Sequence, residues 1–152
     1  MSSINEEVAK LRRIPLFANV DPAKLKLLAF TSERVTFKPG QALFRQGEDG
    51  DRAYVIINGD ADVIVAGAEG EQVVAQVEKN EFVGEIGVLC DTPRTATVRA
   101  RAELVALAVT KDQLLTMLRE FPDFALEMMR VLAERLAATT AELAATRAST
   151  QS

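Results

Sequence analysis

The sequence contains no histidine, no tryptophan and a single cysteine, Cys90. Without histidine, the chain cannot build a Ser-His-Asp triad, a Cys-His pair, a histidine-held haem or the usual zinc sites. One cysteine excludes an intramolecular disulfide and an iron–sulfur cluster held by cysteines. These absences remove the commonest catalytic and redox classes, and they leave binding as the expected chemistry.

Long apolar runs are also missing. No stretch approaches the ~18 apolar residues that a membrane span needs, and the N-terminus MSSINEEVAK is too polar for a secretory signal. We therefore expect a cytoplasmic protein without a membrane partner. The 152 residues, 48% hydrophobic and 26% charged, are typical of one domain with a hydrophobic core. The net charge of −4 argues against a sequence-independent nucleic-acid binder.

The chain divides into three regions by pattern. Residues 1–31 predict N-terminal helices, one of them starting at Asp21-Pro22, a capping residue followed by proline. Residues 34–109 show short β-rich stretches punctuated by glycine, which favour an antiparallel sandwich or roll. Residues 111–147 predict C-terminal helices, opened by a capping box of Thr110 and Gln113 and interrupted at Pro122.

The last predicted helix, residues 123–146, carries two apolar stripes. Phe124, Met128 and Val131 form the stripe expected to pack on the strands. Another stripe has the heptad spacing of a seam with a second helix; its members are Met129, Leu132, Leu136, Thr139 and Leu143. Two interpretations stay open: a helix folded only on its own domain, or a homodimer seam.

The segment FVGEIGVLCDTPRTATV, residues 82–98, carries the candidate chemistry. Gly84 permits close backbone approach, and the residues after it predict one helical turn whose free N–H groups suit an anion. Arg94 follows Glu85 by nine residues. A guanidinium suits a phosphate because its fork donates two parallel hydrogen bonds, and a carboxylate accepts from a hydroxyl. The alternative is a surface ion pair of Glu85 with Arg94, worth about 0–1 kcal/mol.

This segment resembles the phosphate-binding cassette of cyclic nucleotide-binding domains. The matching positions are Phe82, Gly84, Glu85, Gly87, Leu89, Pro93, Arg94, Thr95 and Ala96. The resemblance extends over residues 14–145 and implies an α+β fold. That fold is a single domain, residues 1–152, with an antiparallel eight-stranded β-roll (jelly-roll-like), N-terminal helices, a cassette at 82–97 and a long C-terminal helix.

The resemblance also implies a role for each site residue. Glu85 would bind the ribose 2′-hydroxyl, Arg94 the exocyclic phosphate oxygens, and Thr95 would add a hydroxyl contact to the phosphate. The long helix is similar to the dimer helix of catabolite activator-type members, where Thr139 and Thr140 would meet the purine, Thr140 from the partner subunit. The expected ligand-binding set is Gly84, Glu85, Ile86, Gly87, Arg94, Thr95, Ala96, Val63, Val74, Ala75, Arg135, Thr139 and Thr140.

From these patterns we expect a cyclic nucleotide receptor, with cAMP as ligand and cGMP possible, that uses no metal and is not an enzyme. We expect a homodimer through the 123–146 helix that acts on an unknown effector protein. Because the chain stops at Ser152, where activator-type members continue into a helix-turn-helix, we expect no nucleic acid partner. The alternatives are a degenerate domain serving as a dimerisation scaffold and a cupin-type enzyme, which the absence of histidine disfavours.

Overall fold

The computed structural model describes the backbone of residues 4–151 and the side chains of residues 5–85 and 87–145. The first helical segments are α1 (Ile4–Arg12), η1 (Pro15–Phe17) and α2 (Pro22–Thr31). The strands are β1 (Glu33–Phe37), β2 (Ala42–Phe44), β3 (Arg52–Asn58), β4 (Ala61–Gly67), β5 (Gly70–Val77), β6 (Phe82–Val83), β7 (Thr97–Ala100) and β8 (Leu104–Thr110). The later helices are α3 (Glu85–Cys90), α4 (Lys111–Glu120) and α5 (Pro122–Gln151).

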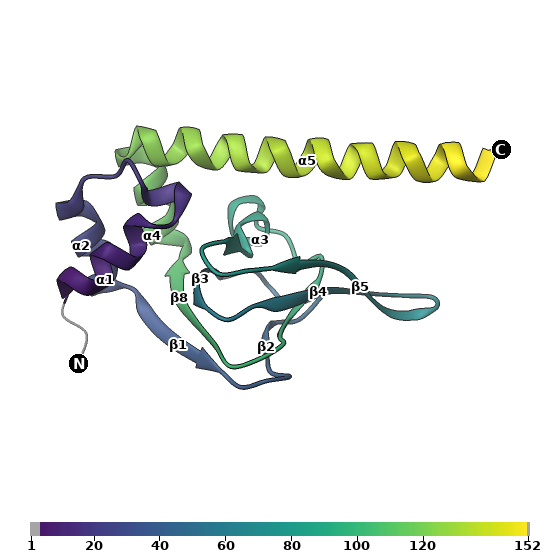
Figure 1. Ribbon diagram of the computed structural model, residues 1–152, viewed down its shortest axis with the longest axis horizontal. Helices are drawn as coiled ribbons and strands as arrows, with labels where there is room; N and C mark the ends of the chain where they lie inside the picture. The colour runs from purple at the N-terminus through teal and green to yellow at the C-terminus, as the bar shows by residue number, and fades with distance from the viewer. Residues whose placement is uncertain (1–3, 152) are drawn as a thin grey trace.

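The strands form two four-stranded antiparallel sheets, ordered β1-β8-β3-β6 and β2-β7-β4-β5. This arrangement confirms the predicted eight-stranded antiparallel roll (Figure 1). Two short elements, η1 and β6, are not among those predicted from the sequence. They span three and two residues, too few for a periodic pattern to show.

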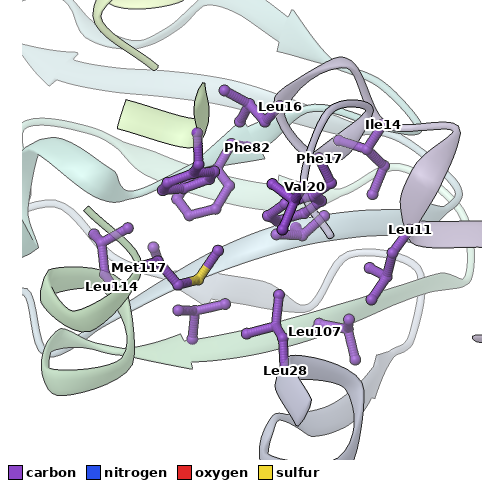
Figure 2. Packing of buried hydrophobic residues seen from close by; sticks show 14 of the residues in the cluster. Leu11, Ile14, Leu16, Phe17, Val20, Leu28, Phe82, Leu107, Leu114 and Met117 are labelled. Carbon is purple, nitrogen blue, oxygen red and sulfur yellow. The ribbon is translucent and has the colours of Figure 1, made fainter. Parts of the chain in front are cut away.

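The sheet that contains β3 and β8 is buried on both faces. Its inner face meets the other sheet in a cluster that includes Tyr54, Ile56 and Leu104. Its outer face packs with the helices in a second cluster, to which it contributes Val55 and Leu107; Figure 2 shows Leu107 in this cluster. Burial on both sides explains why β3 and β8 are nearly continuously apolar, although antiparallel strands often alternate.

The predicted helix boundaries depend on local capping. The Asp21 carboxylate accepts a hydrogen bond from the Ala23 amide at 2.9 Å and begins α2. Thr110 and Gln113 form the expected capping box at the start of α4. Pro122 opens α5 directly after α4 ends, because proline cannot donate the backbone hydrogen bond that would continue α4.

Helix α5 begins in the helical layer and then runs past the roll. Phe124 stacks on Phe17 with ring centroids 5.5 Å apart, and Met128 is buried in the same cluster. Beyond this anchor, α5 passes over α3 and continues in the direction of the β4–β5 hairpin (Figure 1). None of the helices in residues 4–151 combines the length and apolarity needed to cross a membrane.

Candidate functional site

A cavity of about 220 Å³ opens where the cassette faces the second sheet and α5. It is bounded by backbone and side chains of β2, β4, β5, β6, α3, β7 and α5. Its lining residues are Phe44, Val63, Ala75, Val83, Gly84, Glu85, Gly87, Arg94, Thr95, Ala96, Val98 and Arg135. The two cassette residues that carry the predicted chemistry, Glu85 and Arg94, are therefore in one cavity.

Gly84 shapes the entry to α3. Its backbone has a φ of 87°, in the left-handed region that favours glycine. A Cβ atom here would lie 2.8 Å from Nη1 of Arg94 and 3.0 Å from Cε2 of Phe44. Both the backbone conformation and the available space therefore require glycine. The Arg94 guanidinium occupies the space that a side chain at position 84 would need.

Arg94 is held inside the protein by backbone carbonyls and an aromatic ring. Its side chain is 5% exposed, Nη1 donates to the Gly84 carbonyl at 2.7 Å, and Nη2 donates to the Arg52 carbonyl. Its Cζ lies 4.0 Å from the ring centroid of Phe44, a cation–π contact. The Nε atom is buried and has no hydrogen-bond partner among the described residues. Burial lowers the pKa of Arg94, because the charged form loses its hydration inside the protein.

The loop before β3 fixes the backbone around Arg94. The Arg94 amide donates to the Glu48 carbonyl at 2.7 Å, and the Arg94 carbonyl accepts from the Gly47 amide at 2.9 Å. On the same loop, a Cβ on Gly50 would lie 2.7 Å from the carbonyl carbon of Gly87. Gly50 thus permits a close backbone approach of this loop to α3, which the sequence alone does not show.

Glu85 is buried and paired with the long helix. Its side chain is 4% exposed, and Oε1 accepts a hydrogen bond from Nη1 of Arg135 at 2.6 Å. Nη2 of the same arginine donates to the Phe82 carbonyl at 2.8 Å. Burial raises the pKa of Glu85 above its ordinary value, although the Arg135 charge opposes this shift. The surface ion pair of Glu85 with Arg94 is therefore wrong: both residues are buried, and the ion-pair partner of Glu85 is Arg135.

Most of the predicted binding residues share the cavity, and four positions stand apart. Val74 lies at a β-bulge, since Val63 pairs with Ala75 and the next residue of β4 pairs with Val73; Val74 is exposed. Thr139 and Thr140 are exposed on α5, and the Thr139 hydroxyl donates to the Arg135 carbonyl at 2.9 Å. The side chain of Ile86 lies outside the described residues.

The structure also adds three lining residues that were not predicted: Phe44, Val83 and Val98. The alternating pattern of β7 marks Val98 as a candidate for an inner face, whereas the sequence ALF of β2 gives no such signal for Phe44. Pattern alone does not tell whether an inner face meets a core or a cavity. The stacking of Phe44 on Arg94 arises only when β2 and the cassette are folded together.

Comparison with known proteins gives consistent matches. Residues 34–121 match the family model described as the cyclic nucleotide-binding domain. The CRP-like cAMP-activated global transcriptional regulator of Mycobacterium tuberculosis is 30% identical over 135 residues, 88% of this chain and 60% of that protein. The cAMP-dependent protein kinase regulatory subunit of Blastocladiella emersonii is 32% identical over 116 residues, 76% of this chain and 29% of that protein.

Among solved structures, the N-terminal domain of a transcriptional regulator from Streptomyces coelicolor A3(2) superposes with a TM-score of 0.68 at 35% identity. The match covers 86% of this chain and 94% of that chain. By contrast, the chain spans less than two thirds of the two full-length relatives above. The shared unit is therefore the domain itself.

Proposed function

This chain belongs to the cyclic nucleotide-binding domain family and is a regulatory module of that kind; we propose that it binds cAMP in the cavity between the roll and α5, does not turn it over, and signals through α5. The observation that carries the proposal is Arg94, whose buried guanidinium lines the cavity and whose Nε has no hydrogen-bond partner among the described residues. A buried donor without a partner is costly, and a phosphate oxygen would satisfy it.

Glu85 binds the sugar of the ligand in this proposal. A carboxylate is an acceptor, so it suits the ribose 2′-hydroxyl as a hydrogen-bond donor. Thr95, next to Arg94 in the cavity, supplies a hydroxyl for the phosphate. In the described lining Glu85 is the only carboxylate, and it is held by Arg135 rather than placed to activate water. This arrangement supports recognition without turnover.

The preference for cAMP rests on the relatives. The Mycobacterium tuberculosis regulator is named as cAMP-activated, and the Blastocladiella emersonii subunit belongs to a cAMP-dependent protein kinase. In this chain, Thr139 and Thr140 are the residues proposed to meet the purine. Because both are exposed on α5, their contact with a base requires a movement of α5, a second copy of the chain, or both.

Signalling through α5 follows from the size of the cavity and the nature of its walls. About 220 Å³ is below the roughly 300–1,000 Å³ usual for small-molecule sites. Most of the lining residues belong to the sheets and to the cassette with α3, whereas Arg135 belongs to α5. A nucleotide that enters must therefore displace Arg135 or share Glu85 with it, which shifts the equilibrium position of α5.

We further propose that a second copy of the chain covers the seam on α5. Met129, Leu136 and Leu143 recur every seven residues and are 59%, 68% and 59% exposed. An unpaired apolar stripe at heptad spacing is typical of a helix with a helical partner. Leu132, on the edge of the stripe, also packs against the helical cluster, so the seam adjoins the domain core.

Calorimetric titration with cAMP and cGMP tests the proposal. We expect micromolar or tighter binding of cAMP, weaker binding of cGMP, and unchanged cAMP on chromatography after prolonged incubation. Arg94→Ala should weaken binding by at least ~30-fold, because losing a buried charged contact costs roughly 2–5 kcal/mol. Arg94→Lys keeps the charge but loses the two parallel donors of the guanidinium, so its cAMP affinity should lie between those of the wild type and Arg94→Ala.

Arg99→Ala is the matched control. Arg99 lies on β7, outside the cavity, in an exposed ion pair with Glu71. This variant should bind cAMP like the wild type, and thermal melts of all variants confirm that each is folded. If the folded wild type binds neither nucleotide, the receptor proposal is wrong and a dimerisation scaffold becomes the better hypothesis.

A further inference from the structure

A second hollow, separate from the nucleotide cavity, collects positive charge on a protein whose net charge is −4. It measures about 300 Å³ and shares no lining residue with the cavity of Glu85 and Arg94. Four of its lining residues are cationic: Lys10, Arg13, Arg34 and Lys79. They come from α1 and the turn after it, β1, and the turn between β5 and β6.

The backbone beneath these cations is anchored. Lys10 directly precedes Leu11 and Arg13 directly precedes Ile14, and both apolar residues are 0% exposed in the helical cluster. The turn that carries Lys79 is tied to β3, because the Asn80 amide donates to the Ile56 carbonyl at 2.8 Å. The four charges therefore converge from fixed positions and are not scattered over mobile segments.

Compensating carboxylates are few at this place. Arg34 pairs with Glu7. Within the described residues, no ion pair involves Lys10, Arg13 or Lys79. The Glu81 carboxylate, close in sequence, accepts from the Glu78 amide at 3.2 Å and faces a different hollow. Lysine and arginine at the end of α1 suit the helix dipole, but that effect does not account for Arg34 and Lys79.

We infer that this hollow is a second binding site, for a small phosphate-bearing molecule that also has an apolar part. The cations and the amides of Asn58 and Asn80 supply donors for phosphate oxygens. Ile57 and Val105 supply an apolar floor. The volume reaches the range of small-molecule sites, roughly 300–1,000 Å³, and a concave hollow favours such a ligand over an extended acidic peptide.

Phenyl phosphate is the probe, because it joins one phosphate to one apolar ring. It is titrated into the ¹⁵N-labelled full chain saturated with cAMP, so that the first cavity is blocked, and followed by amide shifts. We expect saturable shifts at residues 10–14, 34, 58 and 79–80. Benzyl alcohol, which keeps the ring without the charge, should cause none of them.

Paired variants decide whether the hollow itself binds. Arg13→Gln with Lys79→Gln removes two charges from it and should weaken phenyl phosphate binding by roughly tenfold or more. Lys26→Gln with Lys38→Gln removes the same charge at exposed positions outside the hollow and should leave binding unchanged. Equal losses of phenyl phosphate affinity in both double variants, or amide shifts that never saturate, would mean that the anion only interacts non-specifically with surface charge. Either result would overturn the inference. Tight binding of hexaglutamate without phenyl phosphate binding would also overturn it, in favour of a protein partner.

Discussion

At the scale of single residues, the candidate site depends on the placement of a charge that is already desolvated. Arg94 is 5% exposed before any ligand arrives, and the Gly84 and Arg52 carbonyls hold its two terminal nitrogens. The free energy needed to bury the guanidinium is therefore already compensated when the protein folds, before a ligand binds. A phosphate that reaches it gains a preorganised, low-dielectric contact rather than an exposed one.

Gly84→Ala is predicted to damage both fold and site. The φ of 87° strains any residue with a Cβ, and that atom would fall 2.8 Å from Nη1 of Arg94. We expect a loss of roughly 1–3 kcal/mol in unfolding free energy and a large loss of cAMP affinity. Urea unfolding and calorimetry measure the two effects. Gly67→Ala, at a hairpin position where a Cβ meets nothing within 4 Å, is the control; equal stability losses in both variants would contradict the steric explanation.

Glu85 predicts a pH dependence of stability. Burial raises its pKa in the folded chain above the ordinary 4.5. At pH values between 4.5 and the raised pKa, the native state therefore binds more protons than the unfolded state. The contribution of Glu85 to the unfolding free energy therefore decreases as pH rises from about 4.5 through the raised pKa. Above it, the carboxylate is ionised in both states and the contribution is constant.

Glu85→Gln removes this titration. Denaturant unfolding at a series of pH values should show that the variant gains stability relative to the wild type across that window. The same variant should lose cAMP affinity, because the neutral amide is a weaker acceptor for the ribose hydroxyl. Glu78→Gln, the same charge change at an exposed position, should follow the wild-type profile. A constant difference between wild type and Glu85→Gln at all pH values would refute the proposed shift.

At the scale of secondary structure elements, α5 is attached to the rest of the protein at two places. Near its start, Phe124 and Met128 are buried in the helical cluster. Further along, Arg135 bonds the Glu85 carboxylate and the Phe82 carbonyl. The first attachment is apolar and independent of ligand, whereas the second ends on the nucleotide cavity. The second attachment is thus the one that a ligand can change.

Arg135→Ala is predicted to loosen α5 beyond its apolar anchor. The guanidinium is 39% exposed, so with allowance for solvent screening the contact is worth on the order of 1 kcal/mol. Hydrogen exchange of the amides from about residue 132 onward should be roughly fivefold faster. Arg130→Ala removes an arginine whose ion-pair partners among the described residues are Glu127 and Glu134 of the same helix, so it should leave the cross-element attachment intact. Similar exchange in both variants would show that Arg135 does not hold α5.

At the scale of the whole molecule, the described structure is asymmetric in its exposure of apolar side chains. In the roll and the helical layer most large apolar side chains are buried, the exposed ones being Leu27 and Phe30 on α2 and Val73 and Val74 on β5, while the second half of α5 carries Leu136 and Leu143 in solvent. In Figure 1, α5 leaves the helical layer and has no partner element along this part. A monomer would keep that stripe exposed, and a dimer would bury it.

Leu136→Glu is therefore predicted to give a monomer. Light scattering after size exclusion should report twice the chain mass of 16.5 kDa for the wild type and the single mass for the variant. A glutamate at the centre of the seam would be desolvated beside its symmetry mate, which is unfavourable. Leu27→Glu is the matched control, an exposed leucine that lies on α2 and not on α5. A monomeric wild type would reject the dimer, and dissociation by both substitutions would place the interface elsewhere.

The sequence by itself determined the local features, because these depend on neighbours along the chain. Asp21 and Thr110 cap helices through hydrogen bonds two and three residues ahead, and Pro122 ends a helix by its own geometry. Short β-rich stretches between glycines predicted an antiparallel sandwich or roll, and the resemblance to the family implied that it has eight strands. The cassette pattern led to the family, since its residues are contiguous in the chain. Burial on both faces of β3 and β8 was not predicted, because it requires knowing which layers cover each sheet.

The tertiary structure alone decided how the site residues are paired. The alternative interpretation of the sequence paired Glu85 with Arg94 at the surface, whereas folding brings Arg135, fifty residues away, onto Glu85. It also brings Phe44 onto Arg94 and leaves Val74 exposed at a bulge. Such contacts depend on how two sheets and a helix pack and on which buried charges find partners. Those energies arise between elements, so a pattern read along one element does not contain them.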